Sequence, residues 1–97
     1  MPECVRELLF NIQKNPHKYI GEKSLESLTM FLFGYLHCLF EREENMENFL
    51  AGFQEFVQAR YEISSAHGWS QIIRFFSATE AEAFDTFYEL LCEYYHF

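Results

Sequence analysis

Apolar side chains recur at steps of three and four residues along most of this 97-residue chain. On an α-helix such steps bring side chains onto one face, whereas a half-buried strand needs alternation at every second residue. The clearest run comes after Ser24, whose hydroxyl is suited to capping the start of a helix. It consists of Leu25, Leu28, Leu32, Leu36 and Leu39. This periodicity predicts an all-α fold.

Polar or proline-containing breaks divide the periodic runs into about five helical segments. The break at residues 15–23 is expected to be a loop, because the residue before Pro16 avoids the helical region. Thr79 and Glu82 form the S/T-x-x-E pattern of a capping box and indicate where the last helix starts. The expected helices cover about residues 3–13, 24–40, 45–60, 69–76 and 79 onward. The prediction is a single domain over residues 1–97, folded as one compact bundle of about five helices.

The helix after Ser24 is expected to be the hub of this bundle. Its face opposite the leucines carries Phe31, Tyr35 and Cys38. A helix that is apolar on nearly all sides is normally central.

The three later helices are each expected to bury one face. Asn45, within the charged break at residues 41–47, is a suitable cap for the first of them. The expected inner side chains are Phe49, Phe53, Phe56, Val57 and Tyr61, then Trp69, Ile72, Ile73 and Phe76, and finally Ala83, Phe84, Phe87, Tyr88, Leu91 and Tyr95.

Composition supports a packed interior and argues against a membrane protein. Aromatic residues make up 20% of the chain, which is far too many for a disordered acidic segment. The longest apolar run, residues 28–40, is shorter than the roughly 20 residues that span a bilayer. The first residues include Glu3, Arg6 and Glu7, where a secretory signal needs a basic start and then a continuous apolar stretch. A cytoplasmic protein is therefore expected.

The three cysteines, Cys4, Cys38 and Cys92, are far apart in the sequence. Their odd number and the absence of a C-x-x-C spacing indicate reduced thiols. Each lies in a segment with helical apolar patterning, so each is expected to be a small buried side chain.

No pattern of catalytic or metal-ligating residues stands out. Glu93 and His96 have the Glu-x-x-His spacing of helical di-metal sites, but such sites need a second copy and the chain has none. His67 lies near serines, yet neither a nucleophile elbow nor a glycine-rich phosphate loop is present. The sequence therefore predicts no catalytic residue, no metal and no cofactor. The alternative is an enzymatic or small-ligand module with a pocket near His67 and Trp69.

Charge is the most informative feature for function. Fifteen acidic residues against seven Lys and Arg give a formal charge of −8. Direct binding of nucleic acid, or of an anionic membrane surface, is disfavoured because both need clustered basic side chains. A basic protein partner is the favoured alternative.

Four acids of the last helix are spaced so that they share one face. Like charges at such spacings cost a few tenths of a kcal/mol per pair, and residues 75–97 contain no Lys or Arg. The arrangement is as expected for a surface that binds a basic partner, although an acidic solvent-facing surface has the same pattern. This acid stripe comprises Glu82, Asp85, Glu89 and Glu93. The second choice of contact residues is Glu41, Glu43, Glu44 and Glu47.

Several short strings carry a resemblance to a known family. They are RELL at 6–9, NPHKYIGEKSL at 15–25, FLFGY at 31–35, WSQIIRFFS at 69–77 and EAEAF at 80–84. In these strings the chain resembles a family of small bacterial proteins, some of which look like immunity proteins of contact-dependent growth inhibition toxin systems. The resemblance implies a small acidic protein that blocks a basic toxin nuclease in the cell that produces it, and it implies no catalytic residue.

The charge argument and the resemblance lead to the same hypothesis. Toxin nucleases have basic clefts for nucleic acid, so an inhibitor that presents carboxylates can associate rapidly and cover the active site. The expected function is that of a cytoplasmic immunity protein which binds its partner and performs no chemistry. An adaptor or a component of an oligomer is a further alternative, and a large exposed apolar patch would be its sign.

Overall fold

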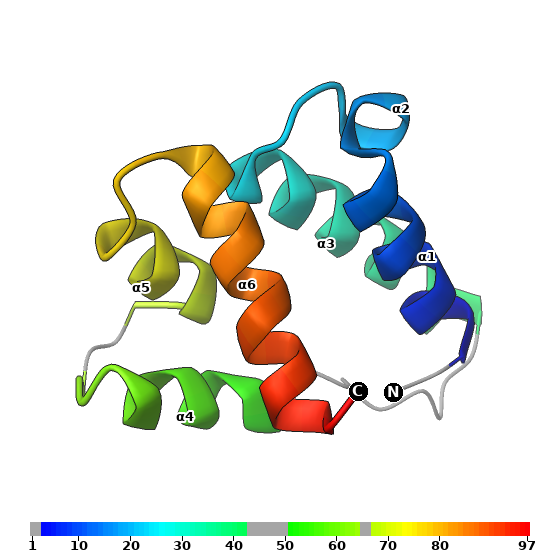
Figure 1. The fold of residues 1–97 in the computed structure, drawn as a ribbon. Coiled ribbons are helices and arrows are strands. Elements are labelled where there is room, and N and C mark those ends of the chain that lie inside the picture. The colour runs from blue at the N-terminus through cyan, green and yellow to red at the C-terminus, as the bar shows by residue number, and fades with distance from the viewer. Residues whose placement is uncertain (1–2, 43–50, 65–66) are drawn as a thin grey trace.

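The computed structural model describes residues 3–42, 51–64 and 67–97, and within these ranges the chain forms six helices and no strand (Figure 1). The helices are α1 (Glu3–Lys14), α2 (Pro16–Ile20), α3 (Leu25–Arg42), α4 (Ala51–Arg60), α5 (Trp69–Phe75) and α6 (Glu80–Tyr95). The predicted all-α class is confirmed, and the number of helices is one more than expected. The Cα radius of gyration of 13.2 Å is close to the roughly 13 Å of a compact chain of this length.

The additional helix, α2, lies in the segment expected to be a loop. The reasoning from Pro16 was right about residue 15, which lies outside both neighbouring helices. It was wrong about residues 16–20, because proline is well tolerated in the first turn of a helix, where its missing N–H needs no partner. Gly21 then ends α2 in the left-handed conformation, with φ of 82°, which glycine adopts without steric cost. A helical turn therefore fits between two breaks.

The start of α6 has the capping box with one change. The amide of Glu82 donates to Oγ1 of Thr79 at 3.1 Å, as predicted. The carboxylate of Glu82 accepts from the amide of Ala78 at 3.2 Å, one residue before the expected donor. Both bonds satisfy amides near the start of the helix that have no partner within it.

The hub of the fold is α6, and the expectation that the helix after Ser24 would be central is wrong. Figure 1 shows α6 crossing the middle of the molecule, with α4 and α5 on one side and α1, α2 and α3 on the other. It packs against α3, α4 and α5, and the hydroxyl of Tyr88 reaches α1 to donate to the carbonyl of Leu9. On α3, by contrast, Met30 and Phe33 remain 72% and 54% exposed.

Aromatic rings from three helices meet beneath α6. Trp69 lies 5.3 Å from Phe53 and 5.1 Å from Phe87 between ring centroids. Burying one such side chain contributes about 1.5 to 3 kcal/mol, so this cluster is a main stabilising contact between α4, α5 and α6. The predicted inner positions of α6 are confirmed as buried for Ala83, Phe84, Phe87, Tyr88 and Leu91, with Leu90 in addition.

The expectation that all three cysteines are buried is met only in part. Cys4 and Cys38 are exposed and Cys92 is half-buried, so the prediction of three buried thiols is wrong for the first two. Asn45 and Phe49 lie outside the described residues.

Candidate protein-binding face

The acid stripe lies on the solvent side of α6. Because α6 turns its apolar positions towards the other helices, the carboxylates on its opposite side remain exposed. All four predicted residues, Glu82, Asp85, Glu89 and Glu93, are accessible to solvent. The structure therefore brings the first-choice contact residues together on one accessible surface.

Two of these acids have cationic partners from elsewhere in the chain. Nζ of Lys23 lies 2.8 Å from Oδ2 of Asp85, and Nε of Arg60 lies 3.7 Å from Oε2 of Glu93. Neither partner was predicted, because residues 75–97 themselves contain no Lys or Arg. Lys23 precedes α3 and Arg60 ends α4, so both reach the stripe only through the tertiary fold.

The other two acids have no ion pair with the residues that the structure describes. Glu82 accepts the Ala78 amide, and Glu89 stands beside a shallow hollow of about 270 Å³. Arg60, Tyr61 and Glu93 also line this hollow. Glu89 is thus the acid of the stripe most available to a partner.

The second-choice acidic cluster is only partly covered by the structure. Glu41 belongs to the last turn of α3, so the expected break at 41–47 begins later than predicted. Glu43, Glu44 and Glu47 lie outside the described residues.

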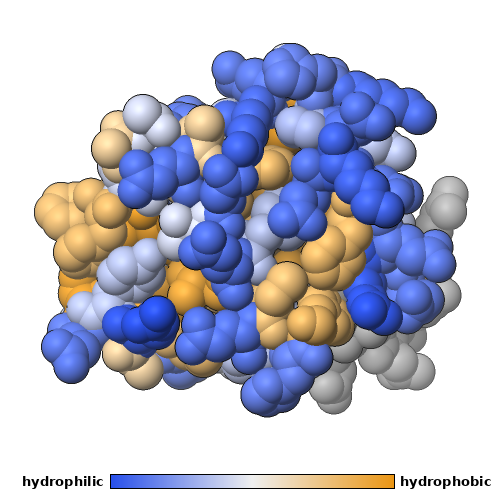
Figure 2. Space-filling view, in the orientation of Figure 1, coloured by the Kyte–Doolittle hydropathy of each residue, from blue (hydrophilic) through white to orange (hydrophobic). Residues whose placement is uncertain are grey.

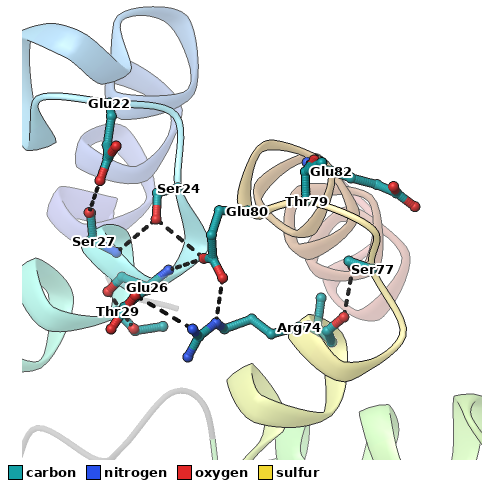
Figure 3. A network of polar contacts seen from close by, with 11 residues as sticks. Glu22, Ser24, Glu26, Ser27, Thr29, Arg74, Ser77, Thr79, Glu80 and Glu82 are labelled. Carbon is teal, nitrogen blue, oxygen red and sulfur yellow. Dashed lines mark hydrogen bonds and ion pairs between the residues drawn. The ribbon is translucent and has the colours of Figure 1, made fainter.

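A fifth acid at the start of α6, Glu80, has a structural role that the sequence did not reveal. Its carboxylate accepts from the Glu26 amide at 2.9 Å, from Oγ of Ser24 at 3.2 Å and from Nε of Arg74 at 2.7 Å (Figure 3). Partial burial alone would raise the pKa of Glu80, but the bonds from Glu26, Arg74 and Ser24 outweigh it and lower the pKa. Glu80 thereby ties the starts of α3 and α6 to α5.

An apolar hollow of about 190 Å³ opens beside α5, on the side where the alternative hypothesis expected a pocket near His67. Phe75 is 81% exposed and Phe76 is 49% exposed, although Phe76 was expected to face the core. Trp69, Ile72 and Ile73 are the buried residues of α5 instead. No sequence signal separates this exposed pair from the preceding adjacent pair, Ile72 and Ile73, which is buried. The lining residues are Ile63, His67, Gln71, Ile72, Phe75 and Phe76.

The alternative hypothesis placed a pocket near His67 and Trp69, but only His67 lines the hollow that the structure shows. Trp69 is buried, with its backbone amide held by Oε1 of Gln54 at 2.7 Å. His67 lines the apolar hollow. The hollow is therefore an aromatic and aliphatic surface, with Phe75 and Phe76 in the place expected for Trp69.

Tyr61 joins the apolar hollow to the acid stripe. Its ring stacks on that of Phe76 with a centroid distance of 4.8 Å and an angle of 9° between planes. The same side chain lines the hollow beside Glu89. Burial raises the pKa of Tyr61; Arg60 opposes this rise, and Glu89 and Glu82 add to it. Figure 2 shows one of the hydrophobic areas on the side where α5 lies, next to hydrophilic surface over the middle of the molecule.

Within residues 3–42, 51–64 and 67–97, no three or more His, Cys, Asp or Glu side chains are placed to hold a metal ion. Every buried side-chain nitrogen or oxygen in these ranges has a hydrogen-bond partner. None of the described helices combines the length and apolarity required to cross a bilayer.

Comparison with protein families, characterised proteins and solved structures finds no match to this chain. The candidate site consequently depends on the geometry of the α4, α5 and α6 face.

Proposed function

We propose that this chain is a cytoplasmic immunity protein, which binds a basic toxin domain and covers its active site with the acidic face of α6. A nuclease is the favoured class of toxin, because its cleft must be basic to hold nucleic acid. One observation carries the proposal. Four carboxylates line the exposed side of α6, and Glu89 has no cationic partner in the described ranges.

The ion pairs already present on the stripe are compatible with such binding. The Lys23–Asp85 and Arg60–Glu93 pairs involve side chains that are each about half exposed. Pairs of this kind stabilise a protein by roughly 0 to 1 kcal/mol. Exchanging Lys23 or Arg60 for a basic side chain of the partner therefore costs little.

Electrostatic attraction supplies the rate of binding. A formal charge of −8 on 97 residues attracts a basic domain over a distance set by the ionic strength. Steering of this type raises association rates by about 10- to 1,000-fold and weakens with added salt. Rapid capture suits an inhibitor that must act before its partner reaches nucleic acid.

The proposal is tested by co-expressing the chain with the product of the neighbouring gene. Recovery of the complex and suppression of nuclease activity are the expected results. The variant Asp85→Lys combined with Glu89→Lys should lower the association rate at low salt by about tenfold or more. Complex formation without loss of nuclease activity would count against the proposed function.

A matched control separates the stripe from overall charge. Glu3→Lys combined with Glu7→Lys changes the net charge by the same amount, four units, on the exposed side of α1. This control should leave most of the association rate intact. Equal losses in both double variants would show that the stripe itself is not the contact surface.

A further inference from the structure

We infer that the binding face has an apolar half. The apolar hollow, which is lined by α5, Phe76, Ile63 and His67, receives an apolar side chain of the same basic partner. This inference rests on the proposed function and adds the position and chemistry of the anchor. The partner is a protein surface that presents an aliphatic or aromatic side chain flanked by Lys or Arg.

Exposure of large rings is the first argument. Phe75 and Phe76 expose 81% and 49% of their surface, at adjacent positions where α5 ends. Their ring centroids are 5.1 Å apart in an edge-on arrangement, so they form one continuous apolar surface with Ile63 and Ile72 of the hollow. Removing a Phe side chain from water contributes about 1.5 to 3 kcal/mol, which is a large gain for a partner that covers this surface.

The hollow has a suitable size for a side chain. Its volume of about 190 Å³ exceeds that of an engineered cavity of about 150 Å³ that admits benzene. Its walls include aromatic rings and aliphatic groups, together with the side chains of Gln71 and His67. Aromatic or aliphatic anchors in such hollows carry much of the energy of protein interfaces.

Continuity with the acid stripe is the second argument. Tyr61 stacks on Phe76 on the apolar side and lines the hollow with Glu89 on the acidic side. The Tyr61 ring is therefore shared by the surface around Glu89 and the surface around Phe76. The two halves form one interface with an apolar anchor and a charged rim.

Charge complementarity selects the occupant. Glu62, which precedes Ile63, is exposed, and the structure shows no cationic partner for Glu62, Glu82 or Glu89 within its described ranges. The nearby Arg74 is held by Glu80 and Glu26. A second copy of the chain would bring the same carboxylates and its own charge of −8 to the interface. A basic partner relieves this repulsion, whereas a dimer would increase it.

Short synthetic peptides test the inference without any toxin. The probe peptide is an amphipathic helix with central leucines flanked by lysines. One control peptide has serines in place of the leucines, and the other has glutamates in place of the lysines. Titration of the full ¹⁵N-labelled chain should show that the probe perturbs amides of residues 61–63, 71–76 and 86–90, with a Kd about tenfold lower than that of either control, a difference equal to about 1.4 kcal/mol.

Two single variants locate the binding surface. Phe75→Ser should raise the Kd of the probe peptide about fivefold or more, because its exposed ring contributes to the hollow. Phe33→Ser removes a ring that is 54% exposed on α3, away from the hollow, and should leave the Kd unchanged. Both phenylalanines are largely solvent-exposed, so circular dichroism should show both variants folded.

Three results would overturn the inference. They are equal binding of the probe and the serine peptide, perturbations centred away from residues 61–76, and self-association of the chain that Phe75→Ser abolishes. The last result would assign the hollow to a second copy. Failure of the proposed function can be told apart from failure of this inference. If the peptide binds at the hollow but the chain does not inhibit a nuclease, the immunity function is wrong and the apolar binding surface stands. Conversely, if the Phe75→Ser variant inhibits the nuclease fully, the apolar anchor is wrong and the proposed immunity function stands.

Discussion

The ammonium of Lys23 lies 2.8 Å from a carboxylate oxygen of Asp85. Glu89, four residues further along α6, has no ion pair with any residue that the structure describes. Asp85 and Glu89 therefore attract a basic partner to different extents. The negative charge of Asp85 is already partly offset by Lys23, whereas that of Glu89 is not offset by any described residue.

This difference predicts that Glu89→Lys slows association with a basic partner more than Asp85→Lys does. Both substitutions change the charge by the same amount, but Glu89→Lys removes a carboxylate that is open to direct contact with a basic side chain, whereas the carboxylate of Asp85 is already engaged by Lys23. A difference of about threefold or more in the association rate at low salt is expected, and it should shrink as salt screens the charges. Stopped-flow measurements at two ionic strengths check it. Equal rate constants for the two variants would show that the Lys23 contact has no influence on binding.

The exposed stripe shows what sequence spacing can and cannot predict. The steps between Glu82, Asp85, Glu89 and Glu93 place them on one face of any helix, so their alignment on α6 was predictable. The approach of Lys23 and Arg60 was not, because it depends on how α3 and α4 pack against α6. Helical periodicity contains no information on such distant partners.

The position of the hub illustrates the same limit. The helix after Ser24 was expected to be central because Phe31, Tyr35 and Cys38 lie opposite its leucines. In the structure Phe31 and Tyr35 are half-buried and Cys38 is exposed, so α3 buries mainly its leucine face. On α6, by contrast, Phe87 and Tyr94 pack on aromatic rings of α4, and Tyr88 reaches α1. Apolar character on all sides indicates that a helix can be central, but the competition between helices decides which one is.

Glu80 should make the stability of the protein depend on acidic pH. Its pKa is lowered in the folded chain, so its contribution is complete above the ordinary value of about 4.3 and is lost as the pH falls through the folded value. Glu80→Gln should lower the free energy of unfolding by roughly 1 to 2 kcal/mol at neutral pH, since bonds to a partly exposed charged group are lost. The variant should approach the parent below the folded pKa.

Urea unfolding between about pH 3 and pH 7 measures this effect. Glu89→Gln is the matched control, because it removes the same charge from an exposed carboxylate with no hydrogen bond that defines the fold. The control should change the unfolding free energy by no more than about 0.5 kcal/mol. A Glu80→Gln profile parallel to that of the parent at all pH values would exclude the proposed linkage.

Tyr88 should stabilise the contact between α6 and α1 through a single buried hydrogen bond. Its hydroxyl donates to the carbonyl oxygen of Leu9 at 2.5 Å. Tyr88→Phe should cost about 0.5 to 1.5 kcal/mol at neutral pH, at little cost in packing because the ring remains. Thermal unfolding should show a decrease of roughly 4 to 8 °C per kcal/mol.

The same substitution should change the response to alkaline pH. Burial raises the pKa of Tyr88 above its ordinary value. Its stabilising contribution is therefore complete below about pH 10 and decreases as the pH rises further, because the unfolded chain ionises more readily. Tyr88→Phe should be less stable than the parent at neutral pH and less sensitive to alkali. A variant that loses stability with alkali as steeply as the parent would assign the alkaline response to other groups.

Gly52 should be required for close packing of α4 against α6. A Cβ atom at this position would collide with the hydroxyl of Tyr94 and lie 3.2 Å from its ring carbon Cζ. The ring has little room to move, because it packs on Phe53 and Phe56 with centroid distances of 5.7 and 5.2 Å. Gly52→Ala should therefore lower the free energy of unfolding by about 1 to 3 kcal/mol, although alanine is normally the better helix former.

A double-mutant cycle with Tyr94→Phe isolates the collision. Without the hydroxyl, Gly52→Ala should cost at least about 0.5 to 1 kcal/mol less than it does in the parent, which is a coupling typical of residues in contact. Gly34→Ala on α3 is the control, since nothing lies within 4 Å of its added Cβ, and it should stabilise the protein by about 0.5 to 1 kcal/mol. Chemical denaturation of the four cycle members and the control gives both values. Additive effects at Gly52 and Tyr94 would mean that α4 shifts to accommodate the methyl group, and the contact between α4 and α6 would then be looser than the structure shows.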